Sequence, residues 1–209
     1  MIEELVPATV TVVATRADLG TELFADELRA LGSAVHSRRR EFETGRACAR
    51  RALAELGLRE AVAVGSGTRG EPLWPAGVVG SITHCARYRA CAVARDHDVL
   101  AVGIDAELDA PLPAGVLATI ASRVEQRALA AHGAGACWDR VLFSAKEAVF
   151  KAWYPLTGQA LAFEDADVRI DPDHGTFTAR LLVDGPLREL HGRWAVAGGI
   201  VATSVAVAR

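Results

Sequence analysis

The chain has 209 residues, of which 51% are hydrophobic and 23% are charged, and its formal net charge is −3. A chain of this length buries enough apolar surface to fold without disulfides or structural metal ions, and its composition excludes a disordered protein. The slight acidic excess excludes a global basic surface for nucleic acid. We therefore expect a globular protein that does not bind nucleic acid and whose functional positive charge is local.

Neither export nor membrane insertion is indicated by the sequence. The stretch MIEELVPATVTVVATR has acidic residues where a secretory signal has basic ones, and no apolar run reaches the ~20 residues that a membrane span needs. The four cysteines show neither a CxxC pair nor zinc-ligand spacing, a pattern typical of free thiols in a reducing compartment. The sequence predicts a cytoplasmic monomer with no membrane partner.

The first half of the chain is predicted to contain one strand, then two helices, then four strands. β-Branched and apolar stretches predict strands at 7–15, 61–64, 78–84, 88–95 and 99–107, and amphipathic stretches predict helices at 21–32 and 37–57. The last three strands are expected to form one antiparallel meander. The stretch SGTRGEPLWP, at 66–75, is rich in Gly and Pro and predicts a loop with Arg69 at its centre.

Arginines crowd the predicted helix 37–57, SRRREFETGRACARRALAELG. A solvated helix face is the ordinary explanation for such a cluster. Arg38 and Arg46, however, are eight residues apart, close to a whole number of helical turns, so they lie on one side if the helix contains both. Guanidinium groups placed together suit phosphate because their forked donors stay charged. His84, at the end of a predicted strand, is by itself more typical of a structural residue.

The stretch DAPLPAG, at 109–115, is the best candidate for a linker between two halves, 1–108 and 109–209. In the C-terminal half, helices are predicted at 116–132 and 136–154, and strands at 168–170, 176–183, 194–196 and 200–207. Each half thus contains helices followed by strands.

Two short motifs bring together the residue types that phosphate chemistry needs. In the helical stretch LFSAKEAVFKAWYPLTG, Glu147 and Lys151 are four residues apart and share a face, with Lys146 one step round. In the strand VGIDAE, Asp105 and Glu107 are two residues apart and point to one side. Three carboxylates and two lysines, if assembled, suit a magnesium ion that holds a phosphorylated substrate.

Four blocks of the sequence resemble the 4′-phosphopantetheinyl transferase superfamily, in its surfactin-type branch and near the enterobactin-synthase component and actinobacterial activating enzymes. The blocks are RRREFETGRACARRAL, GEPLWPAGVVGSITHC, VGIDAE and FSAKEAVFKAWYPLTG, followed by LAFEDADV. They run from about Arg38 to Val168 in the order and spacing of the family.

The resemblance implies transfer of the phosphopantetheine arm of coenzyme A to a serine of an apo acyl or peptidyl carrier protein, with Mg²⁺ as cofactor. It also implies an α+β fold in which two similar halves are related by a pseudo-twofold axis, with the active site between them.

The resemblance further assigns roles to individual residues. Asp105, Glu107, Glu147 and the carbonyl of Ala106 are expected to hold magnesium, with Asp105, Glu147 and Lys151 as the catalytic set and Glu147 as the base. Lys146 and Lys151 are expected near the phosphates. The expected contacts with coenzyme A come from Arg38, Arg46, Arg69, Gly70, Glu71 and Pro72, with Thr83 and His84 near its 3′-phosphate. Glu71 is a departure, because several relatives have lysine before the proline.

Two other functions remain open at this point. One is a different magnesium-dependent enzyme, such as a hydrolase, that acts on a phosphorylated nucleotide with the same carboxylates. The other is a non-catalytic module that binds a carrier protein or nucleotide, although such a module has little need for Asp105, Glu107, Glu147 and Lys151 together. For the carrier protein, the predicted docking surface combines arginines with apolar residues of the C-terminal helices: Arg123, Arg127, Arg140, Leu129, Trp138 and Leu142.

Overall fold

A computed structural model describes residues 1–58 and 62–209. Its helices are η1 (Ile2–Glu4), α1 (Ala25–Leu31), α2 (His36–Glu55), α3 (Val116–Ile120), α4 (Arg123–Ala131), α5 (Trp138–Thr157) and η2 (Phe163–Asp165). Its strands are β1 (Thr11–Thr15), β2 (Gly65–Ser66), β3 (Pro72–Leu73), β4 (Val78–Cys85), β5 (Tyr88–Arg95), β6 (Val99–Leu108), β7 (Ala166–Asp171), β8 (Thr176–Leu181), β9 (Glu189–Ala197) and β10 (Ile200–Ala208). All strand pairs are antiparallel, so the fold is α+β.

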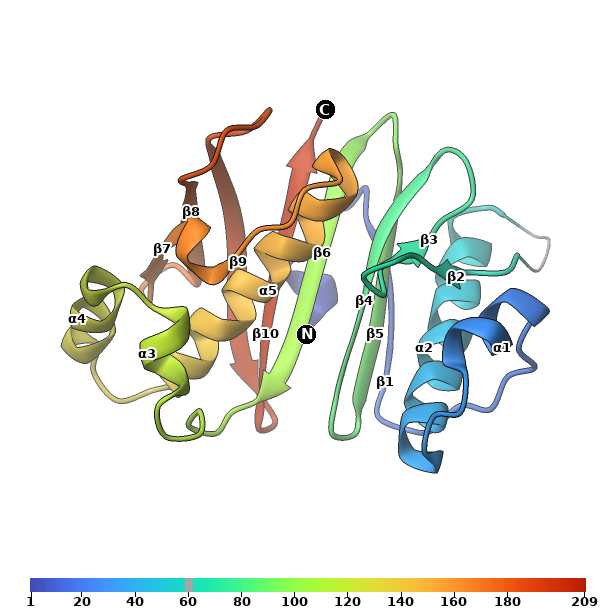
Figure 1. The fold of residues 1–209 in the computed structure, drawn as a ribbon, viewed down its shortest axis with the longest axis horizontal. Helices are drawn as coiled ribbons and strands as arrows, with labels where there is room; N and C mark the ends of the chain where they lie inside the picture. The colour runs from blue at the N-terminus through green and yellow to red at the C-terminus, as the bar shows by residue number, and fades with distance from the viewer. Residues whose placement is uncertain (59–61) are drawn as a thin grey trace.

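Two sheets stand side by side and each carries one long helix (Figure 1). The first sheet has the order β1-β5-β4, and α2 packs against it through a core that includes Ala49, Leu53 and Val93. The second has the order β6-β10-β9-β8-β7, and α5 packs across it, with Trp153 fully buried among residues of both layers. Short strands β2 and β3 form a separate ribbon.

The structure corrects three details predicted from the sequence. Strand β6 does not continue the meander of β4 and β5, but pairs with β10, the last strand of the chain. The helix predicted at 116–132 is divided into α3 and α4, because Ser122 caps the second of these with its side chain. Of the strand predicted at 61–64, residue 61 lies outside the described residues, and 62–64 have no strand structure.

The two sheets meet at a seam between β4 and β6. Within the described residues the seam has no ladder of backbone pairs, because β4 pairs with β5 and β6 with β10. Hydroxyl groups of β4 bridge it instead: Ser81 Oγ accepts the N–H of Ile104, and Thr83 Oγ1 accepts the N–H of Ala106. The buried main chain of β6 is therefore satisfied by side chains along this edge.

Helix α5 approaches β6 closely at a glycine. A Cβ atom added at Gly103 would lie 1.9 Å from the carbonyl oxygen of Ala148 and 2.7 Å from the nitrogen of Ala152. Only glycine permits this contact between strand and helix. The close approach brings the side chains of α5 beside the next residues of β6, Ile104 and Asp105.

Each half contains a buried ion pair that ties its short helix to its long helix. In the first half, the carboxylate of Glu27 on α1 bonds to the guanidinium of Arg50 on α2 at 2.5 Å. The same carboxylate accepts the N–H groups of Phe24, just before α1, and of Val64. Glu27 has 0% of its surface exposed, so the pair is part of the packed interior.

The second half repeats this arrangement with different residues. Glu125 on α4 pairs with Lys146 on α5 at 2.9 Å, and it accepts the N–H groups of Ser122, just before α4, and of Val168. In both halves, therefore, an acid in the first turn of a short helix is bonded to its own helix start, to the main chain of a later segment and to a cation on the 20-residue helix.

None of the helices in residues 1–58 and 62–209 is long and apolar enough to cross a membrane.

Candidate active site

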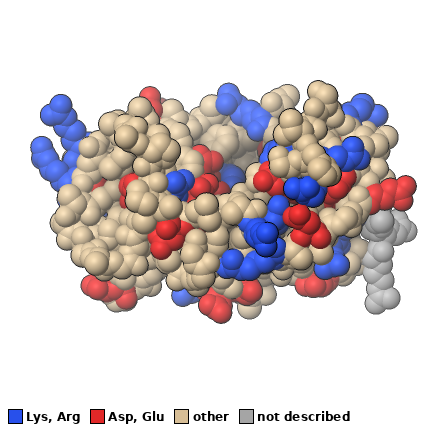
Figure 2. Space-filling view, turned by 90° about the horizontal axis from the view of Figure 1, so that it is seen from below, with Lys and Arg blue, Asp and Glu red and all other residues tan. Residues whose placement is uncertain are grey.

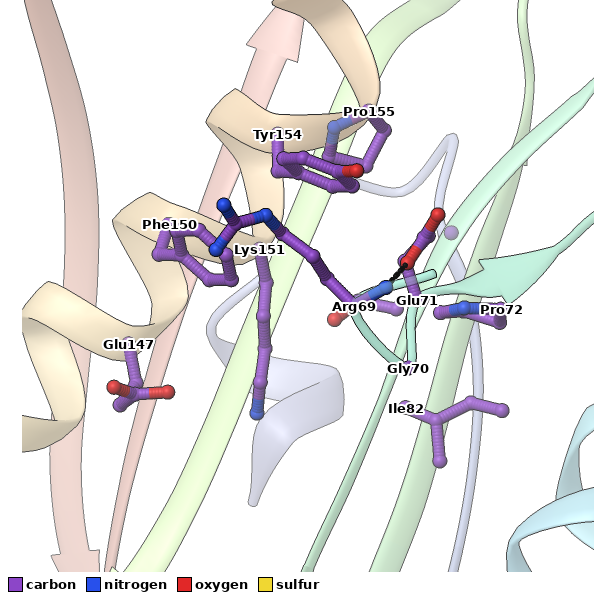
Figure 3. Close-up of a pocket in the computed structure, with 12 residues that line it drawn as sticks. Arg69, Gly70, Glu71, Pro72, Ile82, Glu147, Phe150, Lys151, Tyr154 and Pro155 are labelled. Carbon is purple, nitrogen blue, oxygen red and sulfur yellow. Dashed lines mark hydrogen bonds between the residues drawn. The ribbon is translucent and has the colours of Figure 1, made fainter. Parts of the chain in front are cut away.

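One cavity lies between α5 and the loop that precedes β3, and has a volume of about 210 Å³ (Figure 3). Helix α5 contributes Glu147, Phe150, Lys151 and Tyr154, and the loop contributes the predicted stretch from Arg69 to Pro72. Seen from below, the molecule is hollowed near its centre, where acidic and basic side chains lie close together (Figure 2). The cavity therefore combines side chains from both predicted halves.

Lys151 bonds to the predicted acidic pair. Its Nζ lies 2.7 Å from Oδ1 of Asp105 and 3.2 Å from the carbonyl oxygen of Ile104. Asp105 is buried, and its other oxygen, Oδ2, has no hydrogen-bond partner in the described part of the chain. Burial of a carboxylate oxygen without a hydrogen-bond partner costs folding free energy unless a cation binds to it.

Glu107 is bound by an arginine that the sequence motif does not contain. Arg140, at the start of α5, donates to Oε2 of Glu107 at 3.0 Å and to the carbonyl oxygens of Ala110 and Pro111. Burial raises the pKa of Glu107, and the charge of Asp105 raises it further, while Arg140 lowers it. The charge of Asp105 thus acts on Glu107, two residues further along β6.

Glu147 lies close to the same charges. Burial raises the pKa of its carboxyl, Lys151 opposes that change, and the charge of Asp105 adds to it. Raised basicity in a partly buried carboxylate favours proton transfer. Glu147 therefore has the environment expected of a general base.

The three carboxylates have the donor atoms that a divalent cation prefers, but their side chains do not converge on one point in this structure. Asp105, Glu107 and Glu147 supply the hard oxygen donors that Mg²⁺ prefers, and Asp105 Oδ2 lacks any partner among the described residues. Within residues 1–58 and 62–209, however, no three acidic, histidine or cysteine side chains are positioned to hold a metal ion. Ala106 lies between the two acids of β6, with its N–H bonded to Thr83.

A second cavity, of about 300 Å³, adjoins the first and shares Gly70 and Ile82 with it. It is lined by Arg38, Arg46 and His84, which the sequence analysis assigned to phosphate. The prediction that Arg38 and Arg46 lie on one side of the helix is therefore confirmed.

Arg46 is buried, with 5% of its surface exposed. Its guanidinium donates to the carbonyl of Gly65 and the hydroxyl of Ser66, and it lies 4.2 Å above the ring of Phe42. No described acidic side chain forms an ion pair with it, and its Nε has no described hydrogen-bond partner. Burial lowers the pKa of Arg46 to about 10. A buried cation of this kind is suited to an anionic ligand.

Arg38 and His84 form the rim of the second cavity. Arg38 Nη1 lies 2.6 Å from Nε2 of His84, and both side chains are within 3.7 Å of Glu41. Burial lowers the pKa of His84, and the charge of Arg38 lowers it further. His84 is therefore held as a neutral hydrogen-bonding group beside a permanent cation.

The loop around Arg69 is shaped by Glu71. The carbonyl of Glu71 accepts the N–H of Gly67 at 2.8 Å, and its carboxylate accepts the N–H of Arg69 at 2.9 Å (Figure 3). The guanidinium of Arg69 lies 5.8 Å from the centre of the Tyr154 ring. Glu71 thus folds back on its own loop, and Arg69 supplies the positive charge on the cavity side.

Two predicted ligands are placed differently from expectation. Lys146 is buried, and its ammonium bonds to Glu125 and to the carbonyl oxygens of Phe163 and Ala166, so it is not available to a phosphate in this structure. Thr83 is also buried, and its hydroxyl bonds to Asp105 and to the main chain of β6 rather than lining the second cavity.

The predicted docking surface of the C-terminal helices is also wrong in part. Leu129 and Leu142 are buried in the core, and Arg140 is bound to Glu107. Only Arg123 and Arg127 of its arginines are exposed.

Sequence reasoning missed two contributors to the site. Arg140 is 33 residues from Glu107, and Tyr154 reaches the loop at Thr68, 86 residues away. Neither spacing leaves a local signal, because each contact depends on how α5 crosses β6.

One cavity is lined by arginines, and the adjoining cavity is lined by carboxylates and a lysine. This combination suits an enzyme that acts on a phosphorylated substrate. Comparison with known protein families agrees. Residues 26–94 match the family model described as "4′-phosphopantetheinyl transferase N-terminal domain". Residues 101–203 match the model described as "4′-phosphopantetheinyl transferase superfamily".

Relatives resemble the chain over most of its length. The 4′-phosphopantetheinyl transferase Svp of Streptomyces mobaraensis is 52% identical over 195 residues, covering 89% of this chain and 79% of Svp. The transferase Npt of Nocardia iowensis is 43% identical over 100% of both chains. The transferase PptT of Mycobacterium tuberculosis is 42% identical over 98% of this chain and 97% of its own. The chain belongs to the 4′-phosphopantetheinyl transferase superfamily.

Proposed function

We propose that this enzyme transfers the 4′-phosphopantetheine arm of coenzyme A to a serine of an apo acyl or peptidyl carrier protein, with Mg²⁺ as cofactor. The observation that carries the proposal is the junction of the two cavities at Gly70 and Ile82. A ligand with phosphate at one end and a diphosphate further along can occupy both cavities at once.

The arginine-lined cavity is proposed to bind the 3′-phosphate end of coenzyme A. Arg46 supplies a buried cation without a described acidic partner, and Arg38 with His84 supplies donors at the rim. The stretch from Arg69 to Pro72 then follows the ligand toward α5. This placement uses seven residues that the sequence resemblance assigns to coenzyme A: Arg38, Arg46, His84, Arg69, Gly70, Glu71 and Pro72.

The diphosphate is proposed to lie beside α5. Lys151 neutralises Asp105 in this structure, and its flexible stem lets the ammonium reach a phosphate oxygen instead. Asp105, Glu107, Glu147 and the carbonyl of Ala106 are the proposed ligands of Mg²⁺. Bound there, the ion would neutralise charge that develops on the phosphate oxygens.

Transfer forms a bond between the serine oxygen and the phosphorus atom of the pantetheine arm. The bond from that phosphorus to the bridging oxygen of the diphosphate breaks, and adenosine 3′,5′-bisphosphate leaves. Glu147 is proposed to accept the serine proton, for which its raised pKa suits it. Lys151 and the arginines stabilise the charge on the leaving group.

We also propose that the two halves, 1–108 and 109–209, are related by a pseudo-twofold axis. The repeated ion pairs, Glu27 with Arg50 and Glu125 with Lys146, support this relation, since each ties a short helix to a 20-residue helix. The active site would then lie between the halves of a single cytoplasmic chain that acts as a monomer.

Mass spectrometry of apo carrier proteins tests the reaction. Incubation with the enzyme, coenzyme A and Mg²⁺ should add one phosphopantetheine to the carrier serine and release adenosine 3′,5′-bisphosphate. Hydrolysis of coenzyme A without modification of any carrier in a broad panel would instead indicate a hydrolase. Binding of carrier without either product would indicate a non-catalytic module.

A further inference from the structure

Thr83 lies in the seam between β4 and β6, with 2% of its surface exposed. Its hydroxyl oxygen accepts the N–H of Ala106 at 3.0 Å, and its O–H donates to Oδ1 of Asp105 at 3.3 Å. A hydroxyl has one proton, so the bond from the main chain leaves that proton directed to the carboxylate. The branched Cβ of threonine restricts χ1 and fixes this orientation.

The carboxylate of Asp105 is consequently fixed through one oxygen. Oδ1 accepts bonds from Thr83 and from Lys151, whereas Oδ2 has no partner among the described residues. A carboxylate that is held at one oxygen presents the other in a set direction. Outer hydrogen bonds commonly orient metal-binding carboxylates in this way.

We propose that Thr83 is a positioning residue, whose hydroxyl orients Asp105 to bind the divalent cation of the transfer reaction. This role rests on the proposed function, because Asp105 holds the cation there. It differs from the contact with coenzyme A that the sequence resemblance implies for Thr83.

Ser81 provides a matched control on the same strand. Its hydroxyl accepts the N–H of Ile104 at 3.1 Å, and it is as buried as Thr83, with 2% exposed. Removal of either hydroxyl costs the seam one bond to the main chain of β6. Only Thr83 also bonds to Asp105, so the difference between the two variants isolates the effect on the carboxylate.

The experiment compares Thr83→Val, Thr83→Ser and Ser81→Ala with the wild-type enzyme. Isothermal titration of Mg²⁺ into enzyme without substrates gives the affinity for the ion, and thermal unfolding gives the stability. Thr83→Val should weaken Mg²⁺ binding by about 10-fold or more. Thr83→Ser retains the hydroxyl and should restore most of the affinity, and Ser81→Ala should bind Mg²⁺ like wild type despite a similar loss of stability.

Unchanged Mg²⁺ affinity in Thr83→Val would overturn the role of Thr83, as would an equal loss in Ser81→Ala. If Thr83→Val does not fold, Thr83→Ala measured below its unfolding midpoint replaces it with the same expectations. Asp105→Asn separates this proposal from the proposed function. Wild-type Mg²⁺ affinity in Asp105→Asn would contradict the metal site itself, whereas its loss alongside an unaffected Thr83→Val would contradict only the positioning role.

Discussion

Arg46 shows how a single buried charge can indicate a ligand. Its guanidinium is held by Gly65, Ser66 and the ring of Phe42, none of which neutralises it. An uncompensated buried cation reduces stability, as the lowered pKa of Arg46 reflects. An anion that enters the cavity removes this cost, which makes the residue effective for binding.

Arg46→Met should therefore weaken coenzyme A binding. Stability should change little, because removal of the buried charge offsets the loss of the hydrogen bonds to Gly65 and Ser66. Loss of one charged hydrogen bond should cost about 1.5–3 kcal/mol of binding free energy. Calorimetric titration with coenzyme A and thermal unfolding check the two effects. Arg50→Met is the control, since Arg50 pairs with buried Glu27 and should lose stability with little change in affinity. Unaltered coenzyme A affinity in Arg46→Met would indicate that this arginine has only a structural role.

The raised pKa of Glu147 predicts a dependence of stability on pH. Burial raises that pKa above its usual value of 4.5, so the folded protein binds the proton more tightly than the unfolded chain. The ionised carboxylate therefore reduces stability as pH rises from below 4.5 through the raised pKa. In metal-free protein, Glu147→Gln should gain stability relative to wild type across this window. Urea unfolding at a series of pH values measures the difference in unfolding free energy between the variant and the wild type. A difference that does not change with pH would contradict the raised pKa of Glu147.

At the residue scale, the sequence predicted most of the charged side chains that line the two cavities, but not the direction of each predicted side chain. Glu147 and Lys151 share a face because they are four apart, whereas Lys146 and Lys151 are five apart and differ by about 140° around the helix. Lys146 consequently points to Glu125 in the core. Spacing alone could indicate this divergence, but the buried acid that receives Lys146 lies 21 residues away and gives no local signal.

At the scale of elements, α5 has two separate tasks. One face carries Glu147 and Lys151, which line the proposed active site. A different face anchors the helix through the pair of Lys146 with Glu125 of α4, each with 2% of its side chain exposed. Gly103 lets the helix approach β6 closely enough for Lys151 to bond to Asp105. The position of Lys151 beside Asp105 therefore depends on these packing contacts.

Lys146→Met should destabilise the fold rather than weaken ligand binding. Removal of one partner from a buried pair leaves the other charge uncompensated, at a cost of about 3–5 kcal/mol. Chemical denaturation measures this loss, and coenzyme A affinity well below the midpoint should be near that of wild type.

Lys151→Met serves as the matched control on the same helix. The Lys151 side chain is 26% exposed and its partner Asp105 is 6% exposed, so this variant should lose transfer activity but lose less stability than Lys146→Met. If Lys146→Met were as stable as wild type but failed to bind coenzyme A, Lys146 would be a ligand for phosphate after all.

At the scale of the whole molecule, the sequence predicted the α+β class but not how the sheets join. Consecutive strands pair in most folds, which favoured a meander of β4, β5 and β6. The structure pairs β6 with β10, at the far end of the chain, and joins β4 to β6 through the hydroxyls of Ser81 and Thr83. Such long-range pairing leaves no pattern in a single sequence. It also places Asp105 and Glu107 at the seam between the sheets.

We propose that the two adjoining cavities, lined by Arg46 at one end and by Glu147 and Lys151 at the other, bind coenzyme A and Mg²⁺ across the two halves. A crystal structure of the enzyme with both ligands tests it most directly. We predict that the 3′-phosphate lies against Arg46, Arg38 and His84, and that the diphosphate and Mg²⁺ lie between Lys151 and the carboxylates of β6. Coenzyme A bound with its 3′-phosphate away from Arg46, or a metal ion without Asp105 among its ligands, would rule out this binding mode.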